Sequence, residues 1–407
     1  MAVAVGARPG AFSSLSSPDY RRFFAGQVIS QSGNWMRIAA VSIQVLQITD
    51  SGVALGMVTV AQFGPLLVLG PWAGVLCDRL DRHRLLLGLT VAGAAVATVF
   101  AGFTVIGDPP LWAFYLCTAA AGVVWAFENP VRRVFPVDLV DDDLVANATS
   151  LNATIMITSE VVGMGLAGIL VGGPGLGWCY VLNAVCFVPQ LVLFAGMDRS
   201  GFRSAPMVER AKGQLADGFR YAWRSAEVRL SMLLLTGIGM FGFSTHTVVV
   251  PLLAERDLGG DARTFTLLVA ALSIGSLAGS LHSARTRWVD GRAPARAAIA
   301  FGVLNGLMGL APTVPSALVA AAATGYLCVL AAAGTNALLQ LRTVPQMRGR
   351  VMSLGAMLML GTGPIGGPIV GWIAEAAGAP SALVFGGAVS ALTGVYVVAW
   401  LNRHNSP

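Results

Sequence analysis

Residues 74–84 read GVLCDRLDRHR, a short basic segment between apolar runs at 52–76 and 84–106. Each run is close to the length of about 20 residues that a helix needs to cross a bilayer. A transmembrane β-barrel would instead show alternating strands of about 10 residues. The segment and its flanks therefore predict two membrane-spanning helices joined by a loop on one side of the membrane.

The composition of the whole chain agrees with this prediction. Of the 407 residues, 55% are hydrophobic and 11% are charged, whereas soluble domains have about 25% charged residues. The sequence contains neither a phosphate-binding loop nor a zinc-protease or serine-hydrolase motif. We therefore expect an all-α membrane protein that is not an enzyme and needs no metal or cofactor.

Apolar stretches of spanning length recur along the chain and predict twelve transmembrane helices. Six precede and six follow a polar, basic stretch, so the predicted domains are an N-terminal bundle at 1–197, a linker at 198–229 and a C-terminal bundle at 230–407. The predicted spans are 22–48, 52–76, 84–106, 110–128, 145–171, 176–197, 230–254, 264–284, 296–312, 316–340, 351–375 and 380–401.

The basic residues predict the orientation of these spans. With both termini and the linker in the cytoplasm, 23 of the 26 Lys and Arg residues fall on the cytoplasmic side, as the positive-inside rule requires. A net charge of +6 could also suggest nucleic acid, but its placement in the loops indicates topology. We therefore expect a multi-pass protein of a bacterial inner membrane with no nucleic-acid partner.

The loop at Gly74-xxx-Asp78-Arg79-xx-Arg82-x-Arg84 resembles the loop 2–3 signature of the major facilitator superfamily. Four further stretches are similar to its enterobactin-exporter-like branch, the transmembrane secretion effectors. They are SGNWM at 32–36, PVRRVFP at 130–136, GFRY at 218–221 and QLRTVPQMRGRV at 340–351. The resemblance implies two six-helix bundles with alternating access, and a proton-driven exporter of siderophores, macrolides or other small amphipathic compounds. We also expect the protein to be a monomer.

Two alternatives remain open at this stage. Span five reads VGMGLAG at 162–168 and lacks the proline that many proton-coupled exporters carry there, which leaves an uptake carrier or facilitator as one alternative. The other is a receptor or scaffold that no longer transports. The Gly74, Asp78 and Arg79 signature argues against a scaffold, since a static protein has no need of a moving gate.

The loop signature makes physical sense as a gate. Asp78 would accept backbone N–H groups at a helix end, and Gly74 would allow close packing against span eleven. Arg79 and Arg82 would bridge to carboxylates at adjoining helix ends, among which Glu128 and Asp138 are near in the topology. The alternative is that these arginines only fix the topology.

Charged side chains inside spans are costly and usually have a partner. Arg37 and Glu160 both lie about 15 residues into outward-running spans, about 22 Å from the inner face, so we expect an ion pair in which Glu160 is the candidate for proton coupling. His246, beside Ser244 and Thr245, is a further candidate because histidine titrates near neutral pH. A static pair and a merely hydrogen-bonded histidine are the alternatives.

The resemblance also implies a central cavity lined by spans one, four, seven and ten. These spans carry polar and aromatic side chains that suit an amphipathic cargo better than a small ion. The substrate-cavity candidates are Gln31, Asn34, Trp35, Tyr115, Trp125, Tyr326 and Asn336.

Overall fold

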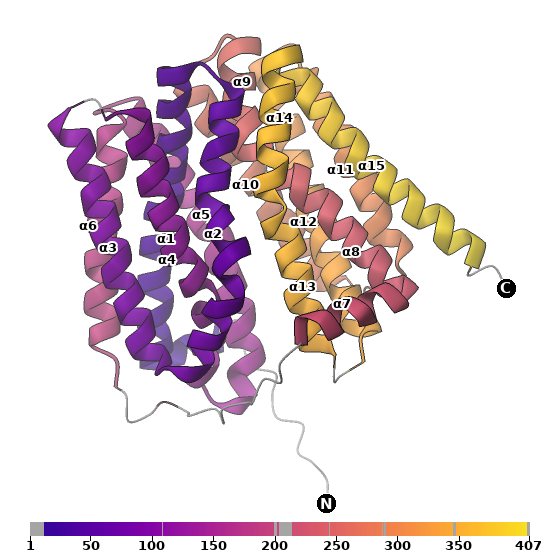
Figure 1. Cartoon of the computed structure of the whole chain (residues 1–407), viewed down its shortest axis with the longest axis horizontal. Helices are drawn as coiled ribbons and strands as arrows, with labels where there is room; N and C mark the ends of the chain where they lie inside the picture. Colours follow the sequence, from indigo (N-terminus) through magenta and orange to yellow (C-terminus); the bar gives the residue numbers. More distant parts are fainter. Residues whose placement is uncertain are drawn as a thin grey trace, which may run out of the picture.

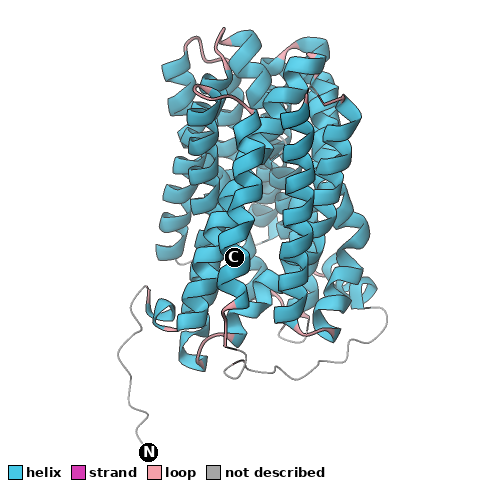
Figure 2. Ribbon diagram, turned by 90° about the vertical axis from the view of Figure 1, so that its left-hand side faces the viewer, coloured by secondary structure: helices cyan, strands magenta, loops and turns pink. Residues whose placement is uncertain are grey.

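The computed structural model describes residues 12–107, 109–198, 202, 214–243, 245–286, 288, 290–344 and 347–404. Throughout these ranges the secondary structure is helical, and the long helices run roughly side by side (Figure 2). Helices suit a lipid environment because each satisfies its backbone hydrogen bonds internally. The predicted all-α class is confirmed for the described chain.

Six helices form a first group, on the left of Figure 1. Helix α1 packs against α5 and α6, α2 packs against α4, and α3 packs against α4 and α6. The helices are α1 (Pro18–Thr49), α2 (Gly52–Arg79), α3 (Arg82–Ile106), α4 (Leu111–Asp138), α5 (Val145–Val171) and α6 (Gly177–Ala195).

The remaining helices form a second group on the right of Figure 1. Helix α10 packs against α12, α11 packs against α12 and α15, and the short α7 lies against α8 and α13. The helices are α7 (Gln214–Arg224), α8 (Ala226–Ile238), α9 (Val250–Leu252), α10 (Ala262–Arg285), α11 (Arg292–Gly309), α12 (Val314–Arg342), α13 (Arg348–Gly361), α14 (Gly363–Ala377) and α15 (Ala379–His404).

Ten helical segments of the described chain are long and apolar enough to cross a membrane. The predicted spans at 22–48 and 296–312 fall in α1 and α11, which are not among the ten. Helix α1 carries buried polar residues, among them Gln27 and Gln31, and the 18-residue α11 includes Arg292 and Arg296. The ten segments are Gly52–Gly70, Arg82–Ile106, Leu111–Asp138, Asn147–Val171, Gly177–Ala195, Ala226–Asp257, Ala262–Ser283, Val314–Arg342, Arg348–Ala377 and Ala379–His404.

The two groups meet along α2 with α14 and along α5 with α10. The α2–α14 contact is backbone on backbone. A Cβ added to Gly52 would lie 2.5 Å from the Gly371 carbonyl oxygen, and one added to Gly56 would lie 2.7 Å from the Pro368 Cα. Glycine is therefore required there by the close approach of the two helices.

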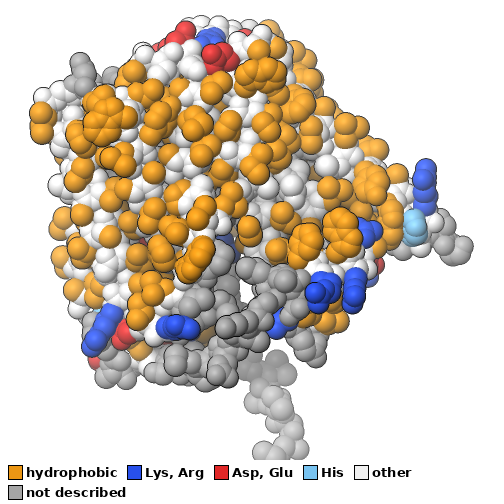
Figure 3. Space-filling model, viewed as in Figure 1, with side chains coloured by type: hydrophobic (Ala, Val, Ile, Leu, Met, Phe, Trp, Pro, Cys, Tyr) orange, Lys and Arg blue, Asp and Glu red, His pale blue; other side chains and the backbone are white. Residues whose placement is uncertain are grey.

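The bundle has two distinct ends. We call the end that carries α7 and the start of α1 the linker end, and the end that carries the α1–α2 turn the far end (Figure 1). Figure 3 shows apolar side chains over the flanks and arginines gathered towards the linker end, with acidic and basic side chains together at the far end. The apolar flanks match a lipid-facing surface.

Candidate functional site

A cavity of about 660 Å³ lies between the two groups of helices. Helices α1 to α6 form most of its wall, and α12 and α13 close it from the second group. Seven of the residues singled out from the sequence line it: Gln31, Asn34, Trp35, Arg37, Trp125, Glu128 and Asn336. The cavity has the size of a small-molecule site and both apolar and polar walls.

The cavity reaches the linker end of the bundle. Its lining includes Arg132 and Arg133 near the end of α4, Gln340 near the end of α12 and Met352 near the start of α13. The site is therefore approached from the linker end.

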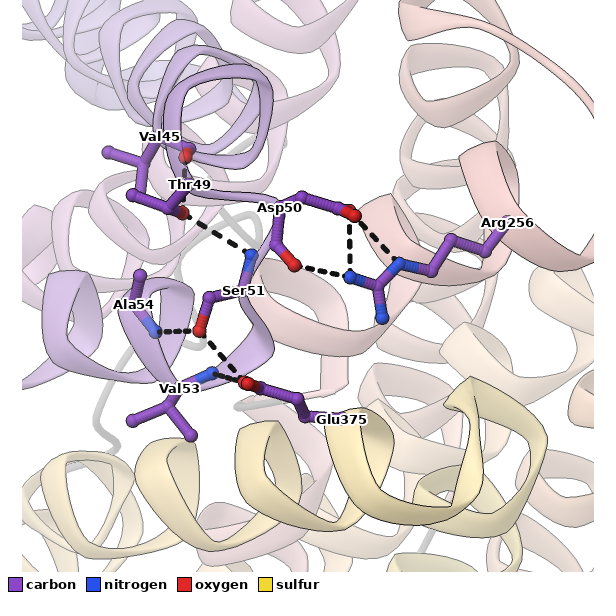
Figure 4. A network of polar contacts seen from close by, with 8 residues as sticks. All are labelled: Val45, Thr49, Asp50, Ser51, Val53, Ala54, Arg256 and Glu375. Carbon is purple, nitrogen blue, oxygen red and sulfur yellow. Dashed lines mark hydrogen bonds and ion pairs between the residues drawn. The ribbon is translucent and has the colours of Figure 1, made fainter.

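A polar network closes the far end (Figure 4). Asp50, in the α1–α2 turn, pairs with Arg256 of the second group at 2.7 Å. On α14, Glu375 Oε2 accepts hydrogen bonds from Ser51 Oγ at 2.8 Å and from the Val53 backbone N–H at 3.2 Å. The carboxylate of Glu375 thus sits at the N-terminus of α2, where the helix dipole favours negative charge.

The polar residues of the cavity wall are only partly paired. Arg37 Nη2 donates to Gln62 Oε1 at 2.9 Å, and Glu128 Oε1 accepts from Gln27 Nε2 at 3.3 Å. The Nη1 groups of both Arg37 and Arg132 are buried and have no hydrogen-bond partner among the described residues. Unpaired buried donors of this kind are costly.

The ion pair expected between Arg37 and Glu160 is not formed in the described part of the chain. Glu160 lies in a second, small cavity beside Trp35, Thr247 and Phe265, whereas Arg37 faces the main cavity and binds Gln62. The two residues have similar depths but point to different faces. Span length gives depth along a helix; it does not give rotation about the axis.

Only part of the loop signature makes the contacts expected of a gate. Arg82 Nη1 binds both Asp138 oxygens, at 2.9 and 2.8 Å, and so joins the start of α3 to the end of α4 within the first group. Arg79 is exposed, and Glu128 lies in the cavity wall away from both arginines. The side chains of Asp78 and His246 lie outside the described part of the structure.

Gly74 lies near the linker end of α2, whereas the close contact of α2 with α14 is made by Gly52 and Gly56 at the far end. These positions are about 30 Å apart along the helix. The expected contact with span eleven therefore exists in this structure at the opposite end of α2.

Two predicted cavity residues do not line the cavity. The Tyr115 hydroxyl donates to the Ala54 carbonyl at 3.1 Å, which joins α4 to α2. Tyr326 on α12 hydrogen-bonds His282 on α10. Both hydroxyls are used for packing between neighbouring helices.

Other residues of the site were missed in the sequence. Arg132 and Arg133 fell outside the predicted span, which ended at residue 128, but α4 continues through Pro130 and Pro136 to Asp138. Their spacing after Glu128 and Asn129 would have placed them on the same helix face. Gln62 stood out only as a polar residue within an apolar run.

The family described as transmembrane secretion effector matches residues 9–404. The multidrug efflux pump Tap of Mycolicibacterium fortuitum is 24% identical over 365 residues, 85% of this chain and 87% of Tap. The enterobactin exporter of Escherichia coli is 25% identical over 372 residues, 87% of this chain and 85% of that protein. The staphyloferrin A transporter of Staphylococcus aureus is 23% identical over 269 residues, 64% of this chain and 65% of that transporter, slightly less than two thirds of its length.

Solved structures share the fold at low identity. A POT family transporter in complex with 5-aminolevulinic acid aligns with a TM-score of 0.74 at 12% identity, covering 98% of this chain and 99% of that chain. A bacterial homologue of the human lysosomal transporter Spinster, in an inward-facing and unoccupied conformation, aligns with a TM-score of 0.68 at 14% identity, covering 94% and 95%. At these identities the likeness is one of fold.

Proposed function

The chain belongs to the transmembrane secretion effector family of the major facilitator superfamily, a family of transporters and not of enzymes, and from this premise we propose that it exports small amphipathic compounds in exchange for protons. The site is the cavity of about 660 Å³. One observation carries the proposal: the cavity is walled by both groups of helices, reaches one end of the bundle and is closed at the other. Alternating access needs this arrangement.

The proposal includes the membrane topology. Helices α1 and α11 cross the membrane with the ten apolar segments, which gives twelve spans in bundles at 1–197 and 230–407 joined by the linker at 198–229. Both termini face the cytoplasm of a bacterium and the protein spans its inner membrane. The distribution of the arginines supports this orientation, and a polar α1 is expected of a helix that lines a water-filled cavity.

In this orientation the structure is inward-open. The contacts that hold it closed on the outside are the Asp50–Arg256 pair, the Glu375 hydrogen bonds and the glycine contact of α2 with α14. Outward opening breaks these contacts, and the loop of Gly74, Asp78 and Arg79 then closes the cytoplasmic side. The monomer suffices, because one chain supplies both bundles.

Glu160 is the strongest candidate for proton coupling, with His246 and Arg37 as further candidates. Glu160 lies on α5 of the first bundle and shares its small cavity with Phe265 and Val269 of α10 in the second. A carboxylate at the surface where two bundles move against each other changes its surroundings during transport. Its protonation can therefore depend on which side is open.

The test uses purified protein in liposomes with an imposed pH gradient, a panel of fluorescent amphipathic compounds and an internal pH dye. We expect cargo movement with counterflowing protons, and we expect Glu160→Gln to lose the dependence on the gradient while it still exchanges cargo. Glu255→Gln, an exposed glutamate at the far end, is the matched control. Cargo movement that ignores the gradient would make the protein a facilitator, and no movement of any compound would contradict the proposed cargo class.

A further inference from the structure

The cavity wall carries more basic than acidic side chains. Arg37, Arg132 and Arg133 line it, and Glu128 is the one carboxylate among its described lining residues. Glu128 lies one helical turn before Arg132 on α4 and already accepts a hydrogen bond from Gln27. The described wall therefore has a formal excess of two positive charges.

Arg37 is the least compensated of these cations. Arg37 is only 3% exposed. Its one hydrogen-bond partner among the described residues is the neutral amide of Gln62. A buried cation without an anion is strongly destabilising, so a negatively charged ligand beside Arg37 would be favoured.

The arginines lie at two depths. Ser17 Oγ donates to the Leu139 carbonyl at 2.8 Å, which places the start of α1 level with the end of α4. With a rise of 1.5 Å per residue, Arg132 lies about 10 Å and Arg37 about 30 Å from this level. The backbone of Arg132 thus lies nearer to the linker end, and that of Arg37 about 20 Å deeper.

The wall between the two depths suits an amphipathic molecule. The rings of Trp125 and Phe63 meet edge to face with their centroids 5.5 Å apart, and both residues line the cavity. The amides of Asn34 and Asn183, which hydrogen-bond each other at 3.4 Å, add polar contacts to the same wall. Apolar rings with a few amides bind a largely apolar body.

We propose, as an extension that rests on the proposed function, that the cavity selects amphipathic organic acids, with Arg37 binding the acid group and Arg132 attracting it at the mouth. A guanidinium binds a carboxylate through two parallel charge-assisted hydrogen bonds, and Arg37 Nη1 is available for one of them. This gives Arg37 a role in binding and leaves Glu160 and His246 as the coupling candidates.

The test is equilibrium binding to the full-length protein in nanodiscs, measured by fluorescence anisotropy with three matched probes. These are 4-(1-pyrenyl)butyrate, its uncharged amide and 4-(1-pyrenyl)butylamine. We expect the acid to bind about tenfold or more tightly than the amide, since a hydrogen bond to a charged group contributes at least about that factor. The amine should bind least tightly.

Three variants assign the preference to the proposed residues. Arg37→Met should lose about tenfold in affinity for the acid and little for the amide, whereas Arg37→Lys should retain part of the preference. Arg403→Gln, an exposed arginine at the end of α15, should change nothing. Because Arg37→Met removes an uncompensated buried charge, we also expect its Tm without any probe to equal or exceed that of the wild type, which guards against reading misfolding as lost binding.

Equal affinity for the three probes, no measurable binding of the acid, or an unchanged preference in Arg37→Met would each overturn the proposal. The outcome is distinguishable from failure of the proposed function, because equilibrium binding requires no transport. Proton-driven export in liposomes without acid selectivity would leave the exporter intact and remove the anion site. Acid-selective binding without gradient-driven movement would support the anion site and contradict proton-driven export.

Discussion

At the residue scale, the far end is closed by the Asp50–Arg256 pair and the Glu375 hydrogen bonds (Figure 4). The side chain of Asp50 is 83% exposed and that of Arg256 is 33% exposed. Exposed pairs contribute only about 0.2–1 kcal/mol. A contribution of this size adds little to folding stability but is enough to bias an equilibrium between two open states.

We therefore expect Arg256→Gln to shift the protein towards the outward-open state. A loss of about 1 kcal/mol corresponds to a factor of about five in the ratio of the two states. The measurement is the rate at which an impermeant thiol reagent, added outside, modifies Asn34→Cys in a background without the five native cysteines. Glu255→Gln on the same segment should leave the rate unchanged, and an unchanged rate in Arg256→Gln would show that the pair does not hold the outer side closed.

The identity of several site residues was predictable from the sequence, but their orientation was not. Gln31, Asn34, Trp35, Trp125 and Asn336 stood out as polar or aromatic residues on apolar helices, and all line the cavity. Tyr115 and Tyr326 satisfied the same criterion and face neighbouring helices. The direction in which a membrane helix turns its polar residues depends on packing against other helices, which hydropathy does not encode.

The two arginines of the loop signature have different surroundings in this structure. Arg82 is bound to Asp138, whose side chain is 8% exposed, while Arg79 is exposed. We expect Arg82→Gln to lower the Tm, because it removes charge-assisted hydrogen bonds from a buried carboxylate at a cost of about 1–3 kcal/mol. Arg79→Gln should leave the Tm unchanged and slow transport. Thermal unfolding and liposome flux, measured on the same preparations, check the predicted Tm and transport rate of each variant. Equal effects of the two variants on Tm would contradict a stabilising role for Arg82 that Arg79 does not share.

At the element scale, the second group contains two interrupted helices that contact each other. The segment after α8 is π-helical at Gly239–Phe243, Thr245–Val249 and Leu253–Asp257, and α13 ends at Gly361 just before α14 begins. A Cβ on Gly239 or Gly366 would collide with the backbone of the opposite helix. π-helical turns often mark functional positions, and this pair lies in the two elements that also contact α2.

The contact between α2 and α14 provides a prediction for these elements. Gly371→Val would force the two backbones apart, since the glycines leave no room for a side chain, and overpacking of this kind costs about 1–3 kcal/mol. We expect a lower Tm and faster external labelling of Asn34→Cys. Gly102→Ala on α3, where an added Cβ meets nothing within 4 Å, is the control. Normal labelling in Gly371→Val would mean that this contact does not seal the outer side.

Most helix positions were predictable because apolar runs of spanning length directly reflect the lipid environment. The features that hydropathy did not show lie at proline and glycine. Pro130 lies inside α4, which continues beyond the predicted end of the span at residue 128. The predicted span 351–375 falls within the single spanning segment Arg348–Ala377, but that segment has a break between α13 and α14 that was not predicted. Membrane helices tolerate such residues because neighbouring helices stabilise them, and that support is a property of the fold rather than of the local sequence.

At the scale of the whole molecule, composition and charge placement were enough to predict a helical membrane protein. The conformation was not predictable, because the alternating access that we propose requires one sequence to encode both an inward-open and an outward-open state. The two states differ by the contacts made at each end of the bundle. In this structure the far end makes such contacts and the linker end opens into the cavity.

Rocking of two rigid bundles predicts opposite changes at the two ends. Helices of 20 residues are about 30 Å long, so a rotation of about 15° about the midplane moves each end by about 4 Å. Spin labels on the cysteine-free background at Asp143 and Arg348 report the linker end, and labels at Ile106 and Leu310 report the far end; these side chains are exposed. In pulsed electron paramagnetic resonance, we expect Gly371→Val to shorten the distance between the labels at Asp143 and Arg348. The distance between the labels at Ile106 and Leu310 should lengthen. Changes of the same sign at both ends, or a change at one end alone, would mean that the bundles do not move as rigid bodies about a central site. Alternating access in this chain would then require a different type of motion.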